Sequence, residues 1–77
     1  MTHWDAEIQK IETHSKHLVT HKPDAIIGIA VDDERKRDYF VPRLQKILDA
    51  NAWAKGLTFR IVPMVGSPID LKVTTLQ

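Results

Sequence analysis

A chain of 77 residues without cysteine excludes a disulfide framework and a thiolate metal site, and its length allows one small domain, residues 1–77, that buries only about 60% of its unfolded surface. Eleven Lys and Arg against ten Asp and Glu give a net charge of +1, so the overall field favours neither polyanions nor membranes. No apolar run approaches the roughly 18 residues of a membrane span, and the N-terminus lacks the pattern of a signal peptide. We therefore expect a soluble, cytoplasmic protein.

The first segment, residues 2–21, has the periodicity of an amphipathic helix. When each residue advances about 100° around the axis, its apolar residues share one face with Ser15. These apolar residues are Trp4, Ile8, Ile11, Leu18 and Val19. Thr2 and Asp5 have the spacing of a capping box, and Pro23 prevents continuation of the helix.

The next segment, AIIGIAV at residues 25–31, has no polar side chain. A half-exposed strand would alternate apolar and polar residues, so the unbroken run predicts a strand with a helix packed on each face. Whether this strand is central or at an edge stays open. At an edge, its unpaired backbone groups would favour pairing with another copy.

Residues 38–55 carry a second apolar stripe at helical spacing. Its members are Phe40, Leu44, Ile47 and Leu48. Because Pro42 would kink a helix that began at Asp33, we expect the helix to begin at residues 38–41, with Gly56 as its C-cap.

Two alternating segments complete the chain, at residues 57–65 and 69–75. Gly66, Ser67 and Pro68 join them and predict an antiparallel hairpin. The order α-β-α-β-β predicts an α+β domain with a three-stranded mixed sheet, a C-terminal β-hairpin and two packing helices. Its β-α-β unit should have parallel strands and a right-handed crossover.

Three histidines in the stretch HSKHLVTH form the first candidate site. His14, His17 and His21 lie on one flank of the predicted helix, and two imidazoles one turn apart can share Zn²⁺. A zinc site needs further ligands, and Lys10 in the same row disfavours a cation. We interpret the row as a solvated or interface-lining face and expect no cofactor; if a metal binds, the candidate ligands are these histidines with Asp32.

The second candidate site is VDDERKRDYF, residues 31–40, between the apolar strand and the second helix. Ligands of parallel sheets lie at the carboxyl ends of strands, near helix N-termini. Asp32 and Asp33 could bind a divalent cation, and the basic residues that follow could contact phosphates. Without a glycine-rich loop, we favour helix capping and a solvated face, and a metal-dependent hydrolase stays an alternative.

Few residues are candidates for catalysis. Ser15 and Ser67 are the only serines, and neither lies in a nucleophile-elbow sequence. The side chains of the adjacent aspartates diverge in an extended segment. We therefore predict that the protein is not an enzyme.

Two partner surfaces follow from the second helix. Trp53 lies almost opposite the apolar stripe, on the flank of Tyr39 and Lys46, where it either folds over the helix end or anchors a partner. A nucleic-acid interface would use the basic segment 35–46, with the two aromatic rings stacking on bases. Its basic contacts would be Arg35, Lys36, Arg37 and Arg43.

The function we expect is that of a non-catalytic protein-binding module. Its partner would be another protein or a second copy in a homodimer, with no membrane partner. A small regulator or inhibitor of a larger assembly, of the kind that phages and mobile elements encode, fits such a chain. Nucleic-acid binding stays the first alternative.

Overall fold

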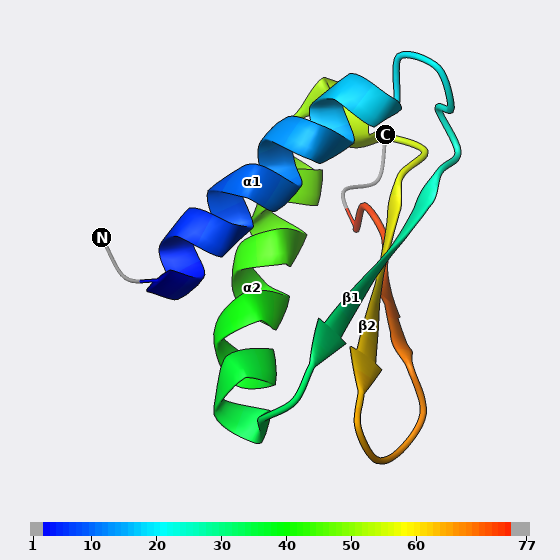
Figure 1. Cartoon of the computed structure of the whole chain (residues 1–77). Helices are drawn as coiled ribbons and strands as arrows, with labels where there is room; N and C mark the ends of the chain where they lie inside the picture. The colour runs from blue at the N-terminus through cyan, green and yellow to red at the C-terminus, as the bar shows by residue number, and fades with distance from the viewer. Residues whose placement is uncertain (1–2, 75–77) are drawn as a thin grey trace.

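The computed structural model describes residues 3–74, which form two helices and a three-stranded mixed sheet (Figure 1). In chain order the elements are α1 (His3–Leu18), β1 (Ile26–Val31), α2 (Glu34–Ala50), the 3₁₀ helix η1 (Ala52–Ala54), β2 (Thr58–Pro63) and β3 (Ile69–Leu71). This order confirms the predicted α+β class. Within residues 3–74, neither helix is long and apolar enough to cross a membrane.

Helix α1 buries the face that the sequence predicts. Ile8 and Ser15 are buried on it, and the hydroxyl of Ser15 donates a hydrogen bond to the Ile11 carbonyl at 2.6 Å, which satisfies this polar group inside the core. Thr2, half of the predicted capping box, lies outside the described residues. Asp5, the other half, accepts a hydrogen bond from the Tyr39 hydroxyl of α2.

Helix α2 begins at Glu34, so the predicted start at residues 38–41 is wrong and Pro42 lies inside the helix. The N-cap is Asp33, whose carboxylate accepts a hydrogen bond from the backbone N–H of Arg35 at 2.7 Å. A proline in a helix interior costs about 3 kcal/mol. Burying large side chains such as Phe40 and Leu44, each about 1.5–3 kcal/mol, offsets that cost.

The predicted C-terminus of this helix is also wrong, because α2 ends at Ala50 rather than Lys55. Asn51 is extended, and its side-chain amide donates to the Ile47 carbonyl at 2.8 Å, which occupies one of the last helical acceptors. Gly56 has a different role from the predicted C-cap. A Cβ there would lie 2.5 Å from the Pro23 carbonyl oxygen, so the two loops can approach only through glycine.

The sheet has the order β1-β2-β3, with β1 parallel to β2 and β2 antiparallel to β3. The predicted hairpin is confirmed, and Gly66 in its turn has φ +99°, a conformation that favours glycine. Because β2 is the only strand beside β1 in the described sheet, β1 lies at an edge, which settles the question that the sequence left open. Thr75, the end of the predicted last strand, lies outside the described residues.

Both helices lie on one side of the sheet (Figure 1). Most strand residues that point toward the helices are buried, such as Ile29 and Ile61. The alternate residues of β1, Ile26, Gly28 and Ala30, are exposed. The prediction that helices cover both faces of β1 is therefore wrong, and this strand is apolar on a face that the described chain leaves open.

Candidate functional site

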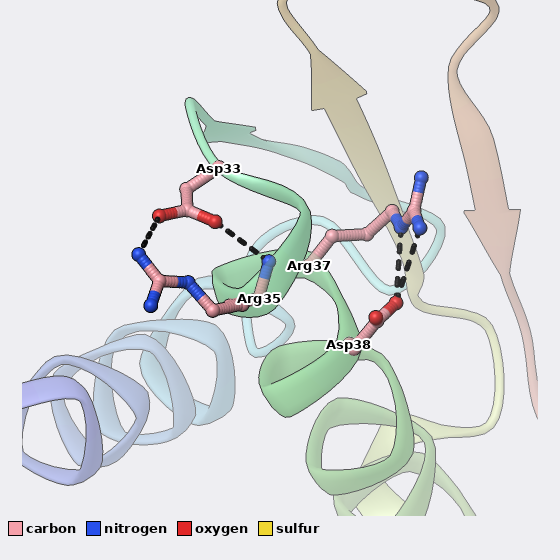
Figure 2. Close-up of polar contacts among 4 residues, drawn as sticks. All are labelled: Asp33, Arg35, Arg37 and Asp38. Atoms are coloured by element: carbon pink, nitrogen blue, oxygen red, sulfur yellow. Dashed lines mark hydrogen bonds and ion pairs between the residues drawn. The ribbon is translucent and has the colours of Figure 1, made fainter.

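Two acidic and two basic residues at the start of α2 pair with one another (Figure 2). Arg35 Nη2 lies 3.3 Å from Asp33 Oδ2, and the backbone N–H of Arg35, followed by its side chain, lowers the pKa of the Asp33 carboxyl. Arg37 pairs with Asp38 at 3.2 Å. The two ion pairs lie on opposite sides of the first helical turn, so they present no single charged cradle.

The carboxyl ends of β1 and β2 border a shallow hollow, as the predicted position requires. Asp32, directly after β1, and Arg37 of α2 line it on one side, and Met64 and Val65 of the hairpin turn line it on the other. Asp33 also lines it, but its carboxylate caps the helix. Within residues 3–74, no group of three or more His, Asp or Glu could hold a metal ion. The hollow therefore combines charged residues on the side of α2 with an apolar wall on the side of the hairpin.

The other basic candidates also have intramolecular partners. Lys36 bridges to Glu7 of α1 at 3.3 Å. Arg43 lies over the Tyr39 ring, 3.5 Å from its centroid, and donates to the Tyr39 carbonyl at 3.0 Å. Phosphate contacts along segment 35–46 would have to compete with these interactions.

The aromatic candidates are similarly engaged. Tyr39 packs 5.5 Å from Trp4, ring centroid to centroid, and donates its hydroxyl hydrogen to Asp5, so it joins α2 to α1. Trp53 lies in η1 and packs, partly buried, against the core, so its predicted position on the helical wheel of α2 does not apply. Lys46 is exposed on α2.

The histidine row is exposed, on and just after α1. His14 and His17 lie on the helix, His21 lies in the turn that follows, and the rings of His17 and His21 are 6.3 Å apart. The described residues supply no third ligand to this pair.

The surface that the sequence predictions missed is the uncovered side of the sheet, which we call the open face. Its residues alternate along each strand with those that face the helices. They are Ile26, Gly28, Ala30, Thr58, Arg60, Val62 and Asp70, of which Thr58 is buried. Ile26 is 55% exposed and Val62 39% exposed. The sequence carries no signal for it, because two helices with apolar stripes could equally have covered one face of the sheet each.

Charge borders the open face on the side of β3. Arg60 Nε donates to Asp70 Oδ1 at 2.8 Å, across paired positions of β2 and β3. The mutual hydrogen bond raises the pKa of Arg60 and lowers that of Asp70. The apolar part of the open face therefore lies on β1 and its neighbour Val62, next to the free edge of the sheet.

The free edge of β1 can be assigned residue by residue. Thr58 donates its backbone N–H to the Ala25 carbonyl at 3.0 Å. In a parallel ladder, alternate residues of a strand bond to the neighbour, so Ile27, Ile29 and Val31 direct their backbone groups at β2. The intervening residues Ile26, Gly28 and Ala30 direct theirs outward. Within residues 3–74, no other residue forms a hydrogen bond to these outward groups.

Comparisons of the chain with protein-family models, with curated proteins and with solved structures found no match. Function is therefore argued from the side chains and backbone of this chain.

Proposed function

We propose that the chain is a non-catalytic protein-binding module that binds through the open face and the β1 edge. The observation that carries the proposal is the coincidence of apolar side chains and unpaired backbone groups on β1. Ile26, for example, is 55% exposed and also directs its N–H and C=O outward. A partner strand or sheet would meet both requirements at once.

The hairpin turn extends this apolar surface. Met64 is 79% exposed and Val65 90% exposed, directly after β2. Met64 also lines a hollow together with Ala30 and Val62, so the apolar surface continues from the open face to the turn, as is typical of interaction sites. The charged residues of the predicted sites form local pairs, so they contribute less to this proposal than the sheet does.

Lysine substitutions test the proposal. Ile26→Lys and Val62→Lys place a charge on the open face, and Thr13→Lys places one on the exposed surface of α1 as a matched control. Proteins captured from a lysate of the source cell would be purified and recombined with each variant in a calorimetric titration, and self-association would be measured in parallel by sedimentation equilibrium. We expect binding of a captured partner to weaken at least tenfold in the two open-face variants, self-association to weaken in Ile26→Lys on the β1 edge, and both to be unchanged in the control. Equal association in all three variants, or none with wild type, would contradict the proposal.

A further inference from the structure

We infer, on the basis of the proposed function, that the partner is a second copy of the chain. Its β1 pairs antiparallel to β1 of the first copy, with the two-fold axis at Gly28. The two three-stranded sheets then form one six-stranded sheet. All helices lie on one side of this sheet, and the open face continues across the junction, because a two-fold axis normal to the sheet preserves its faces.

Hydrogen-bonding capacity favours this register. Ile26, Gly28 and Ala30 each direct a donor and an acceptor outward. With Gly28 opposite Gly28 of the second copy, Ile26 lies opposite Ala30 and Ala30 opposite Ile26. Three donors from each copy then meet three acceptors of the other, six hydrogen bonds in all, and no outward group within β1 stays unpaired.

The side chains fit the same arrangement. A Cβ at Gly28 would meet no atom within 4 Å, and the φ of this glycine is not positive, so neither crowding nor backbone conformation within one chain requires glycine there. Glycine in a strand interior often marks the close approach of another backbone. On the helix side, Ile27 of one copy lies opposite Ile29 of the other, an apolar cross-strand pair that covers the partly exposed Ile27.

The two edges of the sheet differ in protection, which selects β1 as the self-pairing edge. Edge strands that avoid association are short and carry charge or proline. β3 has three residues, contains Asp70, follows Pro68 and precedes Lys72. β1 has six residues without a charge or a proline.

Charge at the ends of β1 sets the strength and the salt dependence of the dimer. The register brings Asp24 of one copy beside Asp32 of the other, at both ends of the paired strands. Like charges in opposed positions weaken pairing. We therefore expect a weak, reversible dimer that salt strengthens by screening this repulsion.

Single cysteines test the geometry, because the chain has none of its own. Across an antiparallel hydrogen-bonded pair the Cα atoms lie about 5.5 Å apart, within disulfide range. We expect Gly28→Cys to form a covalent dimer under mild oxidation, and Ala30→Cys, with Cα atoms roughly 14 Å apart in the dimer, to form none. Val62→Cys, on β2 of the open face, should also form none. Cross-linking of either control as readily as Gly28→Cys would overturn the register, as would failure of Gly28→Cys to exceed them.

A charge reversal gives a second test that leaves Gly28 intact. Asp32→Lys converts both repulsive pairs into attractive ones and should tighten the dimer about 5-fold or more in sedimentation equilibrium, with salt now weakening it. Glu12→Lys, an equal charge change on α1, should leave the dissociation constant unchanged. Equal effects of the two variants would contradict the pairing of Asp24 with Asp32.

Failure of the inference is distinguishable from failure of the proposed function. A wild-type chain that stays monomeric from about 1 µM to about 1 mM overturns the second copy as partner. The protein-binding proposal would then depend on the foreign partner and on its sensitivity to Ile26→Lys.

Discussion

The two faces of the sheet carry similar residues in β1 but lie in different surroundings. Ile29 points toward the helices and is 6% exposed, whereas Ile26, on the opposite face of the same strand, is 55% exposed. The covered face belongs to the core that holds the fold together, and the open face is exposed to solvent in the described chain. Apolar character in a strand therefore predicts burial only when an element is present to cover it.

Lysine substitutions at matched positions on the two faces should give the largest difference in stability. Ile29→Lys buries an unpaired charge and should cost more than about 4 kcal/mol, enough to unfold a domain of this size. Ile26→Lys should change the free energy of unfolding of the monomer by about 0.5 kcal/mol or less. Urea denaturation followed by circular dichroism at low protein concentration measures both, and similar losses would mean that the open face is covered.

Truncation of large side chains should give the next largest difference. Phe59 is fully buried beneath the helices, and Phe59→Ala should lose about 3–5 kcal/mol through the cavity that it leaves. Val62→Ala, on the open face of the same strand, should lose less than about 1 kcal/mol in the monomer. The comparison uses the same urea transitions, and a large loss at Val62 would count against its exposure.

In helix α2, which covers the sheet, one substitution should increase the stability of the domain rather than decrease it. Pro42→Ala restores a backbone N–H inside α2 and should stabilise the domain by about 1–3 kcal/mol, less than the full proline penalty because the unfolded chain gains freedom. The exposed position of Pro42 leaves room for the change. Thermal and urea unfolding should both shift upward, and an unchanged or lowered stability would show that the helix depends on its proline.

Lowering the pH should have the smallest effect on the stability of the domain. The backbone N–H of Thr74, followed by its hydroxyl, lowers the pKa of Asp49, which ties the end of the described chain to α2, and Arg60 lowers the pKa of Asp70 on the open face. Since both folded pKa values lie below the ordinary 3.8, their contributions to stability are present above that value and are lost as pH falls through the folded pKa, below about pH 4.

Urea midpoints measured from about pH 6 to about pH 2 should therefore fall at the acid end. Asp49→Asn and Asp70→Asn should each reduce this acid dependence, because an amide does not titrate there. A midpoint that stays constant down to about pH 2 in wild type would show that these hydrogen bonds do not contribute to folding.

Much of the fold could be predicted from local sequence. The apolar stripe of α1, the strand at residues 26–31 and the turn at Gly66 follow from periodicity and turn chemistry. The boundaries of α2 could not be predicted, because the free-energy cost of a proline or a glycine depends on the packing around it. Pro42 is tolerated because the helix buries a large apolar face, and Gly56 serves the approach of Pro23, a contact that no local pattern shows.

The candidate surface was predictable only in part. Once β1 is known to lie at an edge of the sheet, the outward direction of its backbone groups follows from strand geometry. The hypothesis that β1 pairs with another copy needed only that condition. The engagement of Tyr39 with Asp5, and of Lys36 with Glu7, could not be read from spacing, because each contact joins two helices whose relative position is set by packing.

Local sequence is enough to specify which segments are helix and strand, their order and the apolar character of β1, because these depend on neighbouring residues and on periodicity. That both helices share one side of the sheet and that β1 lies at its edge are known only from the three-dimensional fold (Figure 1). Those features depend on which apolar surfaces meet across the whole chain. The same strand could have been buried between two helices, and it is exposed because both helices pack on the other side.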